Sequence, residues 1–232
     1  MRIDDYVAEL GRSLAGPPGP KRDLVVEARD SLADTADALE AEGLTRAEAE
    51  RLAVRQFGAI AEIAPGYQRE LTGAAGRMLG TLLLISVPIT VLMWSAIWRF
   101  YPYPPAAQAT WAARPAWYNA ASRGLDILQL ATGLYGGLSL LALSRGARWH
   151  LRPQLVTKWL GVVVWVMLPV NGLLILLLLH GADMQGINTY LPAILANFLS
   201  AIFWGLQLYG ATRCLRLTRA TCASPRLPDP RP

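Results

Sequence analysis

The stretch MLGTLLLISVPITVLMWSAIW, residues 78–98, contains no charged side chain and is long enough to cross a bilayer as a helix. Three further stretches pass the same test, at residues 127–144, 159–179 and 190–212. The hydrophobic content of 53% also exceeds that of an ordinary soluble domain. We therefore predict an all-α protein whose residues 73–216 form a four-helix transmembrane domain.

The charges between these stretches predict how the chain is oriented. Basic residues lie between the second and third stretches and again after the fourth: Arg145, Arg148, Arg152, Lys158, Arg213, Arg216 and Arg219. The segment HGADMQGINT, residues 180–189, has no lysine or arginine, and the three arginines of residues 99–124 are outweighed by the neighbouring loops. Because basic loops tend to stay in the cytoplasm, we expect both termini there, including a proline- and arginine-containing tail at residues 217–232.

Residues 1–72 have a different character, because 14 of the 17 acidic residues lie before Gly73. Apolar residues at helical spacing predict a first helix that ends before Gly16 and a second helix from about Pro20 to Gly43. The inward stripe of this second helix is predicted to be Val25, Ala28, Leu32, Thr35 and Leu39. We expect this small helical bundle to be cytoplasmic and too small to be robust without a partner.

A third helix is predicted to begin at Thr45 and end at Gly58. Thr45 and Glu48 have the spacing of a capping box, in which each side chain hydrogen-bonds the backbone of the other. A short further helix or turn at residues 59–71 is expected to lead to the first span.

The segments IDDYVAEL, VVEARDSLADTADALEAEGL and RAEAERLAVRQFGAIAEIAPGYQREL, all within residues 1–72, resemble the permease prefix domain, a relative of the HAAS-type helical signalling domains of bacteria. The resemblance implies a protein of the bacterial inner membrane. Members of this family are often encoded beside PadR-type transcription regulators or precede permease domains. This chain has only four predicted spans and no sizeable extracytoplasmic domain, so a stand-alone membrane regulator fits the resemblance better than a transporter does.

The second helix carries a stripe of carboxylates at three-and-four spacing, made up of Glu27, Asp30, Asp34 and Asp37. One interpretation is a docking face for a basic partner, and the resemblance makes a PadR-like regulator the expected partner. The other is the solvated face that any amphipathic helix needs. We expect no direct binding of nucleic acid, because the positive charge lies in the membrane half of the chain.

Small residues within the spans predict close helix packing. They form a GxxxG pair on the second span, Gly133 and Gly137, and a stripe on the fourth span, Ala193, Asn197, Ala201 and Gly205. This packing can occur within one chain or between copies in a homo-oligomer. Neutral amides at membrane depth are interpreted as interhelical hydrogen-bonding groups: Gln129, Asn171, Asn197 and Gln207. The aromatic loop at residues 99–124 is either a headgroup-level belt or a lid that senses a hydrophobic compound.

Two function classes remain after the motifs are considered. The sequence has none of the common nucleophile, phosphate-binding or zinc motifs, so we expect no enzyme activity, no cofactor and no metal site. The first class is a membrane regulatory protein whose cytoplasmic helices bind or modulate a PadR-like regulator. The alternative is a small oligomeric permease or a component of an export complex.

Overall fold

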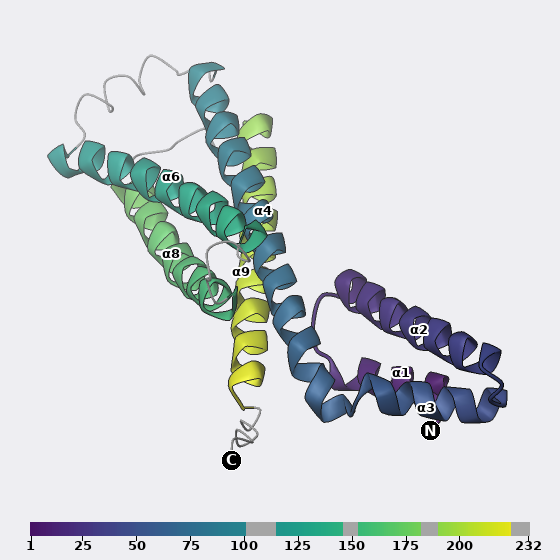
Figure 1. The fold of residues 1–232 in the computed structure, drawn as a ribbon. Helices are drawn as coiled ribbons and strands as arrows, with labels where there is room; N and C mark the ends of the chain where they lie inside the picture. The colour runs from purple at the N-terminus through teal and green to yellow at the C-terminus, as the bar shows by residue number, and fades with distance from the viewer. Residues whose placement is uncertain (101–114, 146–152, 182–189, 224–232) are drawn as a thin grey trace. The chain divides into compact units, whose positions relative to one another are not determined.

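The computed structural model describes residues 1–100, 115–145, 153–181 and 190–223, with no account of the side chains at 179–181 and 220–223. Within these ranges the chain is helical and contains no strand, which confirms the all-α prediction. The helices are α1 (Ile3–Ser13), α2 (Pro18–Ala41), α3 (Arg46–Phe57), α4 (Ile60–Phe100), α6 (Ala116–Ser144), α8 (Pro153–Gly181) and α9 (Leu191–Ala223) (Figure 1).

The chain divides into two compact units. The N-terminal unit comprises Met1–Ala75 and Arg216–Pro232, and the transmembrane unit comprises Gly76–Leu215. Four helices, α4, α6, α8 and α9, are long and apolar enough to cross a membrane, so the prediction of a multi-pass membrane protein is confirmed. Each of these helices extends beyond its predicted span, and α9 runs to Ala223, into the predicted tail.

The core of the N-terminal unit lies between α1, α2 and α3, with Leu71 of α4 added to it. The buried stripe of α2 consists of Leu24, Ala28, Leu32, Ala36 and Leu39. Ala28, Leu32 and Leu39 confirm the predicted stripe, and Val25 is half-buried and packs against this core. The prediction of Thr35 is wrong, because Thr35 lines the outer hollow and the adjacent Ala36 is buried instead. Helix α2 also begins two residues earlier than predicted, at Pro18.

The start of α3 agrees with the predicted capping box. The Glu48 carboxylate accepts hydrogen bonds from the Thr45 backbone amide at 3.2 Å and from the Thr45 hydroxyl at 2.6 Å. The helix ends at Gly58, whose φ of +108° lies in the left-handed region that favours glycine. The Tyr6 hydroxyl donates to the Gly58 carbonyl at 3.0 Å, and the Tyr6 ring packs edge-on against Phe57. These contacts tie α1 to the end of α3.

The predicted short helix or turn at residues 59–71 is wrong, because this segment is the first part of α4. Two contacts secure it to the turn between α1 and α2. The Gln68 side chain accepts from the Ala15 amide at 2.9 Å and donates to the Ala15 carbonyl at 2.7 Å. Gly16 lies so close to Leu71 that an added Cβ would sit 2.9 Å from the Leu71 Cβ. The α4 segment is therefore continuous and belongs to the core of the N-terminal unit.

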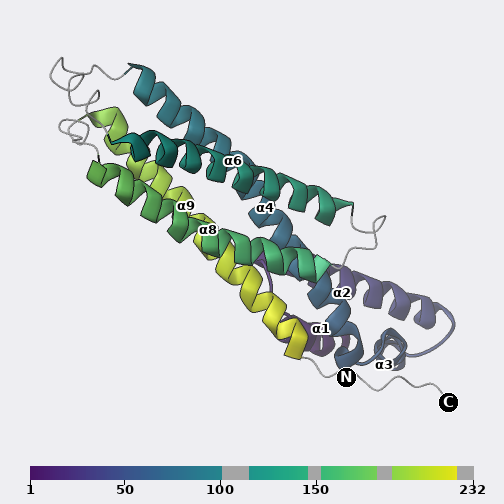
Figure 2. The same cartoon turned by 90° about the vertical axis from the view of Figure 1, so that its left-hand side faces the viewer.

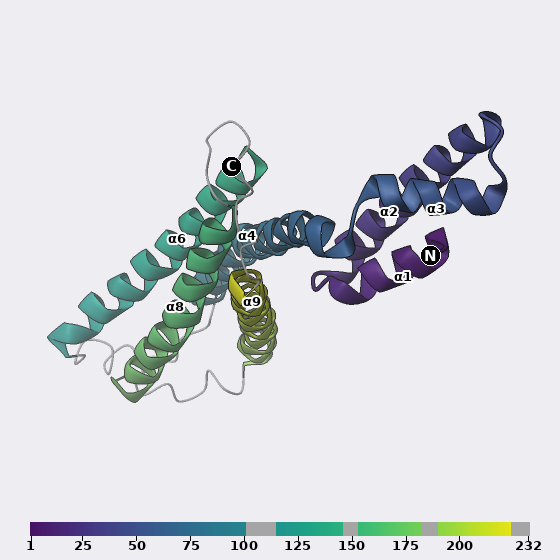
Figure 3. The same ribbon diagram turned by 60° about the horizontal axis from the view of Figure 1, so that its bottom comes forward.

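In the transmembrane unit α6 and α8 pack along each other (Figures 1 and 3). Helix α4 crosses α6 at glycines: a Cβ added to Gly136 would lie 2.6 Å from the Leu83 Cβ, and one added to Gly80 would lie 3.0 Å from the Gly136 carbonyl. Such close approach requires residues without side chains. The end of α4 packs against the start of α9, where the Trp94 indole donates to Ser200 Oγ at 3.2 Å (Figure 2).

Candidate partner-binding surface

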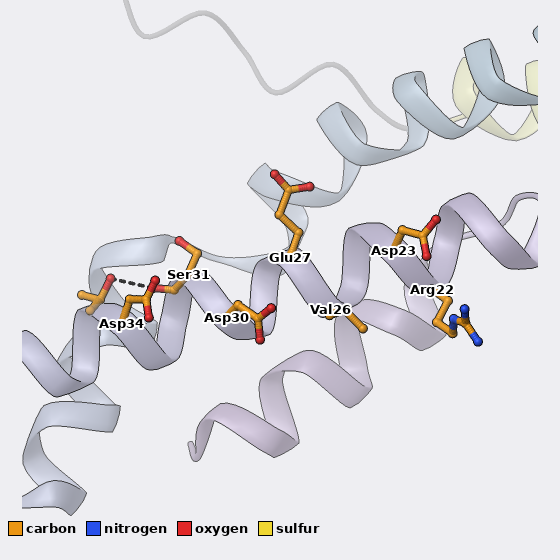
Figure 4. A pocket seen from close by; sticks show the side chains of 8 residues that line it. Arg22, Asp23, Val26, Glu27, Asp30, Ser31 and Asp34 are labelled. Carbon is orange, nitrogen blue, oxygen red and sulfur yellow. Dashed lines mark hydrogen bonds between the residues drawn. The ribbon is translucent and has the colours of Figure 1, made fainter.

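The N-terminal unit presents an acidic face on α2. Asp23, Glu27, Asp30 and Asp34 occupy exposed positions on this helix, line an open hollow along it, and project from the ribbon as Figure 4 shows. Within the part of the chain that the structure describes, none of these four carboxylates forms a hydrogen bond or an ion pair with the protein. We call these four residues the acidic face. Their charges are therefore available to a partner.

Two features of the acidic face were not predicted from the stripe. Asp23 precedes Glu27 by one helical turn and extends the row, which the four-residue spacing in the sequence could have indicated. Val26 is 49% exposed beside these carboxylates and is the one apolar residue among the described residues that line the hollow. A valine on the polar side of an amphipathic helix is the signal that could have identified it.

Asp37 does not share the environment of the other predicted residues. It pairs with Arg46, which also contacts Glu40 at 3.2 Å and Glu50 at 3.3 Å. Hydrogen bonds from the guanidinium to Asp37 and Glu40 raise the pKa of Arg46. Asp37 thus lies in a network that joins α2 to α3, and its charge is compensated within the chain. The structure brings Glu27, Asp30 and Asp34 together as unpaired charges, whereas Asp37 is paired with Arg46.

Helix α2 is held in place from both sides, which gives the acidic face a defined geometry. Arg29 donates to Asp4 of α1 at 2.7 Å, and the Arg46 network links α2 to α3. Leu32 is completely buried on the opposite side of the helix from the carboxylates. A partner would therefore meet a surface on a fixed helix and not a loop.

The predicted packing residues of the spans have different environments. Gly133 and Gly137 lie against Val87 and Leu84 of α4, within the chain. On α9, Ala193 is buried against the end of α4. The other three residues of the stripe are exposed: Asn197, Ala201 and Gly205.

The aromatic loop is described only in part, because residues 101–114 lie outside the described ranges. Trp117 is 41% exposed, and Tyr118 is buried.

Comparison of the chain with protein-family models, with curated proteins and with solved structures finds no match. The resemblance to the permease prefix domain therefore depends on the sequence segments alone.

Proposed function

We propose that this chain is an integral membrane regulatory protein whose N-terminal unit lies in the cytoplasm and binds a PadR-like transcription regulator. In this proposal the acidic face is the contact surface, and the four spans hold the bound regulator at the membrane. A regulator that binds DNA has a basic surface of its own, so the two surfaces are complementary in charge.

The observation that carries the proposal is the absence of internal partners for the acidic face. Carboxylates at Asp23, Glu27, Asp30 and Asp34 repel one another along one helix, and within the described residues none of them forms an ion pair, although Arg22 lines the same hollow. A basic partner would relieve this repulsion and would be drawn to the surface by long-range attraction. The exposed Val26 beside them would supply an apolar contact that a purely solvated face does not need.

The membrane itself is a poor occupant for the acidic face. The cytoplasmic leaflet is negatively charged, and it attracts basic segments and repels acidic ones. The basic loops that predict the orientation would lie on the same side of the membrane and would interact with the negatively charged leaflet. The carboxylates would then stay free for a soluble protein. Attachment to the membrane would raise the local concentration of that protein.

A subunit of an oligomeric permease is the second candidate, and one observation favours it. Asn197, Ala201 and Gly205 are exposed on α9, so their small side chains and one amide face away from the rest of the chain. Such a surface suits packing against another helix in lipid. The regulatory function accounts for the acidic face as well, and we therefore prefer it.

The proposal is tested by reconstituting the full chain in liposomes and adding a purified PadR-type regulator encoded in the same genome. We expect the regulator to float with these liposomes in a density gradient and to stay in solution with protein-free liposomes of the same lipid. The binding should weaken as salt is raised, because it depends on charge. A regulator that never floats with the protein-containing liposomes would rule out the proposed function.

A further inference from the structure

The transmembrane unit has a small, partly open cavity whose lining mixes polar and apolar side chains. It has a volume of about 40 Å³ and lies between all four long helices. Its polar lining consists of Thr90 from α4, Gln129 and Thr132 from α6, Asn171 from α8 and Gln207 from α9. Polar side chains from four separate helices meet there in an otherwise apolar unit.

One polar atom at this cavity lacks a partner. Asn171 is only 7% exposed, and among the described residues no donor lies within hydrogen-bond distance of its Oδ1 atom. The nitrogen of the same side-chain amide does have a partner, because Asn171 Nδ2 donates to the Met167 carbonyl at 2.9 Å. A buried acceptor without a partner costs about 1–3 kcal/mol. Among the described residues no donor reaches Asn171 Oδ1, although the side chains of Gln129 and Trp204, which carry N–H groups, also line the cavity.

The hydroxyl groups of the lining do not supply this donor, because their protons are committed to backbone carbonyls. Thr90 donates to the Ser86 carbonyl and Thr132 to the Leu128 carbonyl, both at 2.8 Å. A hydroxyl has one proton and two lone pairs, so both threonines present only acceptor oxygens to the cavity. Gln207 Nε2 is also engaged and donates to Ser86 Oγ at 2.8 Å.

The occupant of the cavity is defined by these groups. It must donate to Asn171 Oδ1, and it can accept from the second amide hydrogens of Asn171 and Gln207. It must be neutral, because no ionisable side chain lines the cavity and an unpaired charge at membrane depth is costly. A volume of about 40 Å³ admits roughly two or three water molecules and nothing much larger.

We propose that this cavity is an internal hydration site, in which bound water donates to Asn171 Oδ1 and bridges α8 to the other three long helices. The water completes the polar contacts that the side chains leave open, as buried water does in other proteins.

The direct test is a water-to-amide cross-relaxation measurement on the full chain in nanodiscs with deuterated lipids. We expect the side-chain amide of Asn171 to show a cross-peak to water. Asn197 is the matched control. It is an asparagine exposed on α9 within the candidate span, where lipid and not water would surround it, so it should show no such peak. Exposed Asn119, before the apolar part of α6, should show a strong peak. A missing peak at Asn171 while Asn119 is detected would overturn the proposal.

A chemical test does not require the NMR assignment of the Asn171 side-chain amide. The test uses two chains whose native cysteines are replaced by alanine. Thr132→Cys places a thiol in the cavity, and Leu134→Cys places one on the exposed side of the same helix. Thiols react as thiolates, which form only where water is present. We therefore expect methyl methanethiosulfonate to modify the thiol of Thr132→Cys at least about tenfold faster than the thiol of Leu134→Cys. Adding Asn171→Leu should remove this difference. Equal rates in the two single-cysteine chains would contradict a hydrated cavity.

Discussion

The crossing of α4 and α6 should be sensitive to a single methyl group. In Gly136→Ala the new Cβ would lie 2.6 Å from Leu83 Cβ and 3.1 Å from Leu83 Cδ1. Carbon atoms prefer separations of about 3.5–4.0 Å. Neither Cβ can rotate away, so the two helices must separate. Overpacking costs about 1–3 kcal/mol, and the higher helix propensity of alanine returns up to about 1 kcal/mol. We therefore expect the free energy of unfolding to fall by about 1–2 kcal/mol.

The neighbouring glycine provides the control for this prediction. In Gly137→Ala the new Cβ would meet only the Leu84 Cδ1 atom, at 3.2 Å, and this methyl group lies at the end of a flexible side chain. We expect the free energy of unfolding of Gly137→Ala to stay within about 0.5 kcal/mol of the unsubstituted chain. Both variants can be compared by reversible unfolding of the full chain in bicelles. If Gly136→Ala is as stable as Gly137→Ala, α4 and α6 do not cross as described.

Four further outcomes are expected. Thr45→Ala should lower the melting temperature of the N-terminal unit, at a cost of about 1 kcal/mol. Hydrogen bonds from Thr45 lower the pKa of Glu48. The stability that Glu48 contributes is therefore present above the ordinary glutamate pKa and is lost as the pH falls through the lowered value. Glu48→Gln should differ from the unsubstituted chain in melting temperature at pH 6 but not at pH 2. A cysteine at Gly186 should react with an impermeant thiol reagent from outside intact cells and one at Gln154 should not, and the reverse pattern would contradict the orientation. Gly205→Ala should not lower the unfolding free energy, because nothing lies within 4 Å of its added Cβ and alanine has the higher helix propensity, and a measured loss would indicate a contact between copies.

Features that depend on one helix alone were predictable from the sequence. The four spans follow from apolar length, and the start of α3 follows from the pairing of Thr45 with Glu48 three residues later. The inward stripe of α2 was predicted except at Thr35, where the adjacent Ala36 is buried, and Leu24 joins the half-buried Val25 in the core. Which of two adjacent residues is fully buried is decided by the packing of α1 and α3 against α2.

Features that depend on how two helices meet were not predictable. Asp37 continues the helical spacing of Asp30 and Asp34, yet it pairs with Arg46 because the turn between α2 and α3 brings that arginine beside it. The sequence highlighted Gly133 and Gly137 by their spacing, whereas the closest approach of α4 and α6 involves Gly80 and Gly136. That contact depends on the register between the helices, which neither helix specifies by itself.

The acidic face can be tested by reversing the charges that have no internal partner. Three of the four carboxylates of the acidic face, Glu27, Asp30 and Asp34, should be replaced together by lysine, and Asp37 left in place because it pairs with Arg46 of α3. The substituted positions are exposed, so the helices should survive, and circular dichroism of the full chain checks this. Like charges would then face each other across the proposed interface, at a cost of several kcal/mol.

The measurement is the dissociation constant between a PadR-type regulator and the full chain in nanodiscs at low salt. The control chain carries the same change in charge at exposed positions away from the acidic face, Asp5, Glu9 and Glu42. The proposal predicts that reversal of the acidic face weakens binding by at least about 30-fold, roughly 2 kcal/mol, and that the control weakens it by no more than about threefold. Equal weakening in the two chains, or undiminished binding after reversal of the acidic face, would contradict a docking role for α2.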